Sequence, residues 1–215
     1  MFDICPVMIR AISLVWSPAT VWERIVQEKK GLGLVFVAYF FPMMVLAALG
    51  EGSALERWRT WTAGAHGVMH FTFGQIVVFE AIRSVVTCVI VGVSAHVIWV
   101  LREPFYGRYN YTEALMLVMY SVCPMFLCQV LTGIPQISLW LSWGVGVYFS
   151  LRIFNDGVRC LAKTDPGSAT GLFLLSSLVI IALTGVQRFM LIQCLSGRGS
   201  SINNFIYDFA AKLTS

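Results

Sequence analysis

The chain has 215 residues, of which 58% are hydrophobic and only 12% are charged, and its formal net charge is +4. A soluble domain of this size would not tolerate such a composition, whereas a polytopic membrane protein requires it. The cations cluster beside apolar segments and form no patch of the size that nucleic acid needs, so no nucleic-acid partner is expected.

The first segment in chain order is amphipathic. Residues 6–30 alternate apolar with charged side chains, and Ser17-Pro18 is typical of a helix start. Tryptophans beside basic residues suit a helix in the headgroup region, and the predicted interfacial anchors are Trp16, Trp22, Lys29 and Lys30. A helix packed under the bundle, with both tryptophans in the core, is the alternative interpretation.

Five apolar runs follow, each close to the length of about 20 residues that a membrane-spanning helix needs. The runs are continuous and lack the alternation of a β-barrel, so we predict helices, whose backbone groups bond internally. The sequence therefore predicts an all-α integral membrane protein, a five-transmembrane-helix bundle with an N-terminal amphipathic interfacial helix. The predicted spans are Leu34–Leu49, Val85–Leu101, Glu113–Leu131, Ile134–Phe154 and Leu172–Ile192.

The connections are too short for a soluble catalytic domain. The longest, Glu51–Gln75, is expected to lie along the outer surface, and Thr132-Gly133 is expected to form a tight reversal. Leu101–Thr112 and Asn155–Thr170 are the predicted cytoplasmic loops, the second turning at Asp165-Pro166-Gly167. The chain thus divides into an amphipathic segment at 1–32, a membrane domain at 33–195 and a flexible tail with helical spacing near its end at 196–215.

Basic residues indicate the orientation. The positive-inside rule favours a cytoplasmic N-terminus and, with five spans, an outside C-terminus. The basic residues that then lie on the cytoplasmic side are Arg10, Arg24, Lys29, Lys30, Arg102, Arg108, Arg152, Arg159 and Lys163.

The fourth predicted span carries small residues at every fourth position. Such a stripe lets helix backbones approach closely, which favours packing within the bundle, with a homodimer contact as the alternative. The predicted packing residues are Ser138, Ser142, Gly146 and Ser150, and the candidates to face them from the second span are Gly92 and His96.

Pro42 and Pro124 lie inside the first and third predicted spans, where each is expected to kink its helix. Kinks can shape a cavity, as in transporters, but the ionisable residues here lie at span ends, where we expect them to reach water by snorkelling. Glu80 and Arg83 are spaced to pair, and Arg188 lies on the same side. The candidates to line a polar cavity are Glu80, Arg83, His96, Tyr120 and Pro124.

No catalytic motif stands out. His66 and His70 lie at helical spacing for a shared metal, but no third ligand is evident. The six cysteines are scattered and include no Cys-x-x-Cys pair, which fits neither a disulfide framework nor a zinc site. We therefore expect no enzyme activity, no cofactor and no metal.

Short motifs form an ordered set along about residues 12–192. They are Ser17-Pro18 with Trp22, Tyr39 to Pro42, Tyr120 to Pro124, Gly133-Ile134-Pro135, Tyr148 and Asn155-Asp156-Gly157. This set resembles the Yip (Ypt/Rab-interacting protein) domain family in its bacterial form. The resemblance implies a compact five-helix bundle in a bacterial inner (plasma) membrane.

Eukaryotic members of that family engage Rab-type GTPases and form complexes with one another, but their Asp-Leu-Tyr-Gly-Pro and Gly-Tyr signatures are absent from this sequence. We expect instead a non-enzymatic protein that acts through contacts in the membrane with lipid, with a membrane-protein partner or with its own copies. The alternatives are a small transporter or lipid-translocating protein with a cavity between the kinked first and third spans, and an accessory subunit of a larger membrane complex.

Overall fold

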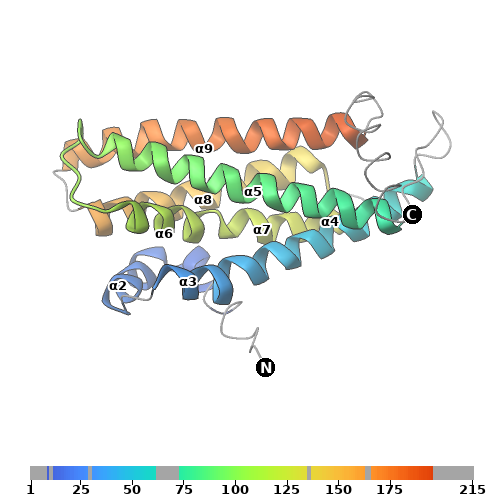
Figure 1. Ribbon diagram of the computed structural model, residues 1–215, viewed down its shortest axis with the longest axis horizontal. Coiled ribbons are helices and arrows are strands. Elements are labelled where there is room, and N and C mark those ends of the chain that lie inside the picture. The colour runs from blue at the N-terminus through green and yellow to red at the C-terminus, as the bar shows by residue number, and fades with distance from the viewer. Residues whose placement is uncertain are drawn as a thin grey trace.

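The protein is a bundle of long helices that run side by side (Figure 1), which confirms the all-α class. The computed structural model describes residues 9, 12–28, 31–61, 73–134, 137–162 and 166–195, and none of them is in a strand. Within these residues, the helices long and apolar enough to cross a membrane are Leu32–Ser53, Phe73–Leu101, Tyr111–Val130 and Gly167–Phe189. These are four of the five predicted spans.

The first of these helices is continuous but irregular. It consists of α3 (Leu32–Val35), a π-helical turn η1 (Phe36–Phe40) and α4 (Phe41–Trp61). Pro42 follows the π turn directly, and its ring cannot sit against the carbonyl four residues earlier. The backbone widens there, so that the Phe41 N–H bonds the carbonyl of Phe36. The predicted distortion at Pro42 therefore takes the form of a π turn.

The predicted connection from Glu51 to Gln75 is partly wrong. Helix α4 continues through Glu51 to Trp61, and α5 (Phe73–Leu101) begins well before the predicted Val85. Both helices therefore extend past their most apolar segments, and residues 62–72 between them lie outside the described part of the chain.

The third predicted span is broken in the middle. Helix α6 (Tyr111–Ser121) ends at Ser121, and after Val122 helix α7 (Cys123–Val130) begins with Pro124 in its first turn. Because Pro124 has no N–H to bond a carbonyl of α6, the helix of the third predicted span is interrupted at this point. At the other end of α6, the Glu113 carboxylate accepts the Asn110 backbone N–H at 2.8 Å, which stabilises the helix start.

The rest of the chain runs along the bundle as two further helices. The 3₁₀ turn η3 (Leu131–Gly133) makes the predicted reversal, and α8 (Leu139–Ala162) then contacts η3 and α7 as well as α2 (Pro18–Glu28). Helix α9 (Pro166–Leu195) begins at Pro166, so the turn predicted at Asp165-Pro166-Gly167 is corrected: Pro166 is the first helical residue, a position that suits proline.

Helix α2 is held under the bundle by one tryptophan. Trp22 is completely buried, its Nε1–H donates to the Ile153 carbonyl of α8 at 2.9 Å, and its ring meets Tyr120 edge-on with centroids 5.7 Å apart. The interfacial role predicted for Trp22 is therefore corrected to a core role, because the indole N–H finds its acceptor inside the protein. Trp16, by contrast, is 83% exposed. The other two predicted anchors, Lys29 and Lys30, lie outside the described residues.

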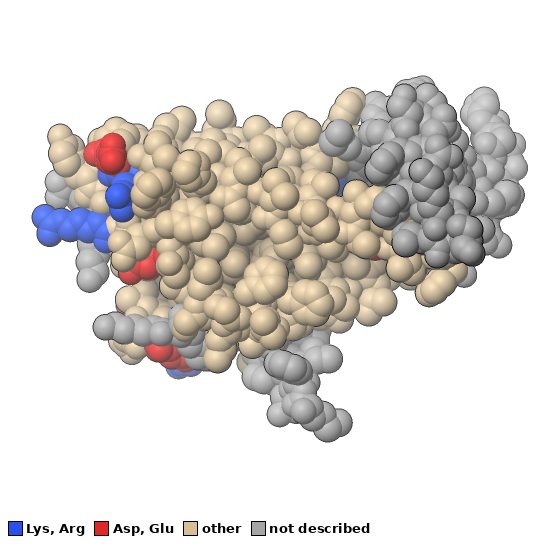
Figure 2. All heavy atoms as spheres, in the orientation of Figure 1, with Lys and Arg blue, Asp and Glu red and all other residues tan. Residues whose placement is uncertain are grey.

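On the face drawn in Figure 2, the exposed charged side chains of the described residues gather mainly at the end of the α5–α6 loop, and the helix bodies beside them present an uncharged surface. At this end the α5–α6 loop is fixed by Tyr109, whose hydroxyl donates to the Ile98 carbonyl at 2.8 Å. Burial raises the pKa of Tyr109 to about 12, although the charge of Arg102 acts in the opposite direction. The phenol therefore keeps its proton and remains a hydrogen-bond donor at neutral pH.

The close contact between α8 and Trp22 yields a first prediction. A Cβ at Gly157 would lie 2.7 Å from Trp22 Cε2, and the ring cannot move without breaking its bond to Ile153. Gly157→Ala is therefore expected to destabilise the fold by about 1–3 kcal/mol, measured as a lower thermal midpoint in detergent. The control is Gly144→Ala on the same helix, where no atom lies within 4 Å, and equal midpoints for the two variants would contradict the packing.

Candidate functional site

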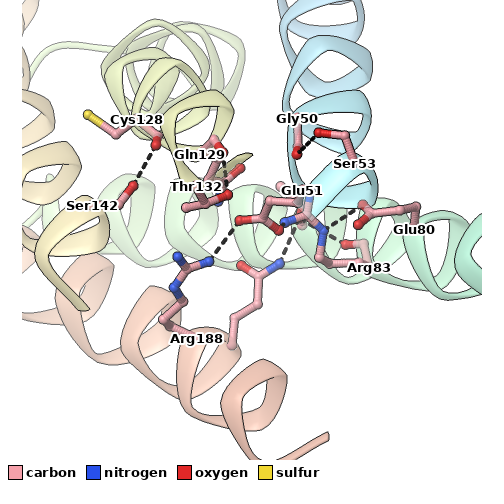
Figure 3. Close-up of polar contacts among 12 residues, drawn as sticks. Gly50, Glu51, Ser53, Glu80, Arg83, Cys128, Gln129, Thr132, Ser142 and Arg188 are labelled. Atoms are coloured by element: carbon pink, nitrogen blue, oxygen red, sulfur yellow. Dashed lines mark hydrogen bonds and ion pairs between the residues drawn. The ribbon is translucent and has the colours of Figure 1, made fainter. Parts of the chain in front are cut away.

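Four charged side chains from three helices meet inside the bundle, at the end opposite α2 (Figure 3). They are Glu51 of α4, Glu80 and Arg83 of α5, and Arg188 of α9, and Glu51 and Arg188 are each only 4% exposed. Charged side chains are almost never so completely buried unless they are paired. We call these four residues the ion-pair cluster and take it as the candidate site.

Glu51 is the centre of the ion-pair cluster. Its Oε1 accepts from Arg188 Nη1 at 2.7 Å, and its Oε2 pairs with Arg83 Nη1. Arg83 Nε in turn donates to Glu80 Oε2 at 3.0 Å. Two carboxylates thus alternate with two guanidinium groups, so that their formal charges cancel within charge-assisted hydrogen bonds.

Polar contacts around the cluster join further helices. Gln187 Nε2 of α9 donates to Thr87 Oγ1 of α5 at 2.8 Å, and Ser142 Oγ of α8 donates to the Cys128 carbonyl of α7 at 2.5 Å. Beside Glu51, α4 and α7 touch through their backbones, since a Cβ at Gly50 would lie 2.7 Å from the Cα of Val130. The glycine thus permits the approach that brings Glu51 into the bundle.

The rise of the helices gives the depth of the cluster. Counted from the helix ends on the α2 side, at 1.5 Å per residue, Glu51 lies about 28 Å along its helix, Arg83 about 27 Å and Arg188 about 33 Å. A hydrocarbon layer is about 30 Å thick. With the α2 side of the helices at one boundary of the layer, the cluster lies close to the other.

The expectation that these residues reach water by snorkelling is wrong. Glu80, Arg83 and Arg188 point into the bundle because Glu51, which the sequence placed in a connection, is there to pair with them. The two glycines that flank Glu51 favoured a loop and concealed it. The signal that could have revealed the site is the balance of two acids and two arginines at similar depth in three apolar helices.

The structure brings together only part of the predicted polar cavity. Glu80 and Arg83 bond each other as expected. His96, however, lies about 24 Å along α5 from Glu80. It is exposed there, and its ring centroid is 5.6 Å from that of Trp99. Tyr120 belongs instead to an aromatic contact with Trp22, and Pro124 opens α7. The cavity predicted from these five residues is therefore not formed as a unit.

The predicted stripe of small residues faces α7 over most of its length. Ser142, Gly146 and Ser150 are buried and Ser138 is exposed, and a Cβ at Gly146 would lie 3.0 Å from the Cα of Met125. The structure therefore places this stripe within the chain's own bundle. Gly92, expected to face the stripe, has no atom within 4 Å of a Cβ built on it, so it does not make that contact.

The histidine pair of the sequence, His66 and His70, lies outside the described residues. Within the described ranges, no group of three or more His, Cys, Asp or Glu side chains is arranged to hold a metal ion.

Comparison with known families agrees with this architecture. The model of the Yip1 domain matches residues 12–187. The chain belongs to the Yip1 domain family. The matched region of this Yip1-domain protein begins ahead of α2, includes Glu51, Glu80 and Arg83, and ends directly before Arg188. No curated protein and no solved structure matches the chain.

The ion-pair cluster yields a second prediction. Glu51→Gln would leave two buried guanidinium groups without their shared carboxylate, so we expect a destabilisation of about 3–5 kcal/mol, measured as a lower thermal midpoint. Glu103→Gln, a change at an exposed glutamate of the α5–α6 loop, is the control. The double variant Glu51→Gln/Arg188→Gln should recover part of the loss. A midpoint for Glu51→Gln equal to that of Glu103→Gln would contradict the pairing.

Proposed function

We propose that this Yip1-domain protein is a non-enzymatic membrane component that acts through protein or lipid contacts in the bilayer. The observation that carries the proposal is that the charged side chains of the ion-pair cluster are paired with one another. The two carboxylates and two guanidinium groups of the ion-pair cluster balance one another. Two cavities that described residues line have volumes of about 10 and 20 Å³, each with room for about one water and too small for an organic substrate.

The space in which a transport cavity was expected is filled. Between the first and third apolar helices, Tyr39 meets Tyr120 with ring centroids 4.6 Å apart, and Phe40 meets Phe126 at 5.4 Å. Buried aromatic pairs of this kind contribute packing beyond the area that they bury. This packing favours a function through protein or lipid contacts over transport. Transport is the second candidate function, and the distorted helices at Pro42 and Pro124 are the feature that favours it.

We further propose five spans: the four apolar helices named above and α8, which is the fourth in chain order. Helix α8 contacts η3 near one end and α2 near the other, although Arg152, Asp156 and Arg159 in its second half make it less apolar than its neighbours. The basic residues of the loops on the α2 side, among them Arg102 and Arg108, support a cytoplasmic N-terminus and an outside C-terminus in a bacterial inner membrane.

The N-terminal helical residues supply a surface for lipid. Ile9, Ile12 and Trp16 are exposed, by 59%, 53% and 83%, and their spacing places them on one side of a helix. Trp22 fixes the adjoining α2 to the bundle. A tryptophan on such a face suits the headgroup region.

The topology gives a third prediction. Ile134→Cys, in the α7–α8 connection, is expected to react with a membrane-impermeant maleimide added to intact cells. Gly167→Cys, at an exposed position in the first turn of α9, lies beyond α8 from Ile134 and is expected to react only after permeabilisation. The unmodified chain measures the background, since its described cysteines are buried or half-buried. Labelling of both variants from the same side would contradict a membrane-spanning α8, and with it the five spans.

The function gives a fourth prediction. The purified protein is reconstituted into vesicles that contain a fluorescent phosphatidylethanolamine. Because the protein is not expected to translocate lipid, the probe of the inner leaflet should stay protected from dithionite, as in protein-free vesicles.

Chemical crosslinking in native membranes is expected to capture a stoichiometric protein partner, a second copy or one enriched lipid. Loss of probe protection, or a chain that crosslinks to none of these, would overturn the contact function. A capture within a fixed multi-subunit assembly would support the contact function in its accessory-subunit form.

A further inference from the structure

A small cavity adjoins the ion-pair cluster on the inside of the bundle. Its volume is about 20 Å³, and the side chains around it come from α5, α7, α8 and α9: Arg83, Met125, Gln129, Trp143, Thr184, Gln187 and Arg188. Most of them carry hydrogen-bonding groups, although the cavity lies among apolar helices.

Two buried polar atoms of this lining have no partner among the described residues. They are the Oε1 of Gln129, an acceptor, and the Nε1–H of Trp143, a donor. A buried polar group without a hydrogen bond lowers the stability of the fold. Two such atoms in one small cavity therefore indicate a bound ligand. The ligand has to donate to one atom and accept from the other.

Size and charge decide which ligand fits. Two arginines line the cavity, which would attract an anion, but Glu51 and Glu80 already neutralise them. A further charge would add an unbalanced ion to a neutral buried cluster, which is costly in an apolar medium. The volume suffices for one water molecule, which needs about 10–15 Å³, and is too small for a phosphate group. A neutral ligand of one heavy atom that both donates and accepts is water.

We propose that this cavity is a binding site for one ordered water molecule, which accepts from Trp143 Nε1–H and donates to Gln129 Oε1. The water joins α7 to α8 in a cavity that Arg83 and Arg188 of the ion-pair cluster also line. This site is independent of the contact function and of the number of spans.

The test is an NMR measurement of contact between water and the indole proton of Trp143. A ROESY spectrum is recorded on the full chain, labelled with ¹⁵N-tryptophan and dissolved in deuterated detergent. The Trp143 signal is assigned by its absence from the spectrum of Trp143→Phe. A dipolar cross peak between the Trp143 indole proton and water is expected. Trp22, whose indole bonds the Ile153 carbonyl, is the internal control and should show none. Thr184→Val, which removes a nearby hydroxyl that could relay exchange, should leave the Trp143 peak in place.

A double-mutant cycle on thermal midpoints provides an independent measurement. Trp143→Phe and Gln129→Met each remove one partner of the water, so each is expected to lower the midpoint by a few degrees. The double variant should lose less than the sum of the two, because one shared water is lost once. Absence of the water cross peak at Trp143, or additive losses in the cycle, would overturn the proposal.

Discussion

One carboxylate between two arginines organises the end of the bundle opposite α2. Taking these charges out of water is expensive, and the cost is offset only when every partner is present and hydrogen-bonded. Glu51 meets this condition by pairing with Arg83 and Arg188 at once. Because the three residues belong to helices that are far apart in the chain, the ion-pair cluster fixes α4, α5 and α9 relative to one another.

The other end of the bundle is fixed by a neutral contact. Trp22 inserts its ring between α6 and α8 and satisfies its only donor on a backbone carbonyl. Between the two ends, aromatic rings pack the first apolar helix against the third, and small residues of α8 pack against α7. These contacts fill the space between the helices that they join.

Prolines account for the two irregularities of the spans. Pro42 follows a π turn and Pro124 follows a break, and in each case the missing donor and the bulk of the ring act on the preceding turn. Both effects could be predicted from the sequence, because they depend on the chemistry of a single residue. The two distortions differ in form: the Phe41 N–H bonds the Phe36 carbonyl just before Pro42, whereas helix α6 ends before Pro124 and α7 starts anew.

The sequence by itself determined the membrane class, the helices, their approximate order and the Yip family, because these follow from apolar length and from local motifs. It also paired Glu80 with Arg83, which are neighbours on one helix. Tertiary structure decided that Trp22 is a core residue, that Glu51 is helical and buried, and that Arg188 turns inward. The physical reason is that lipid and protein interior are equally apolar, so hydrophobic periodicity does not tell which side of a spanning helix faces its neighbours.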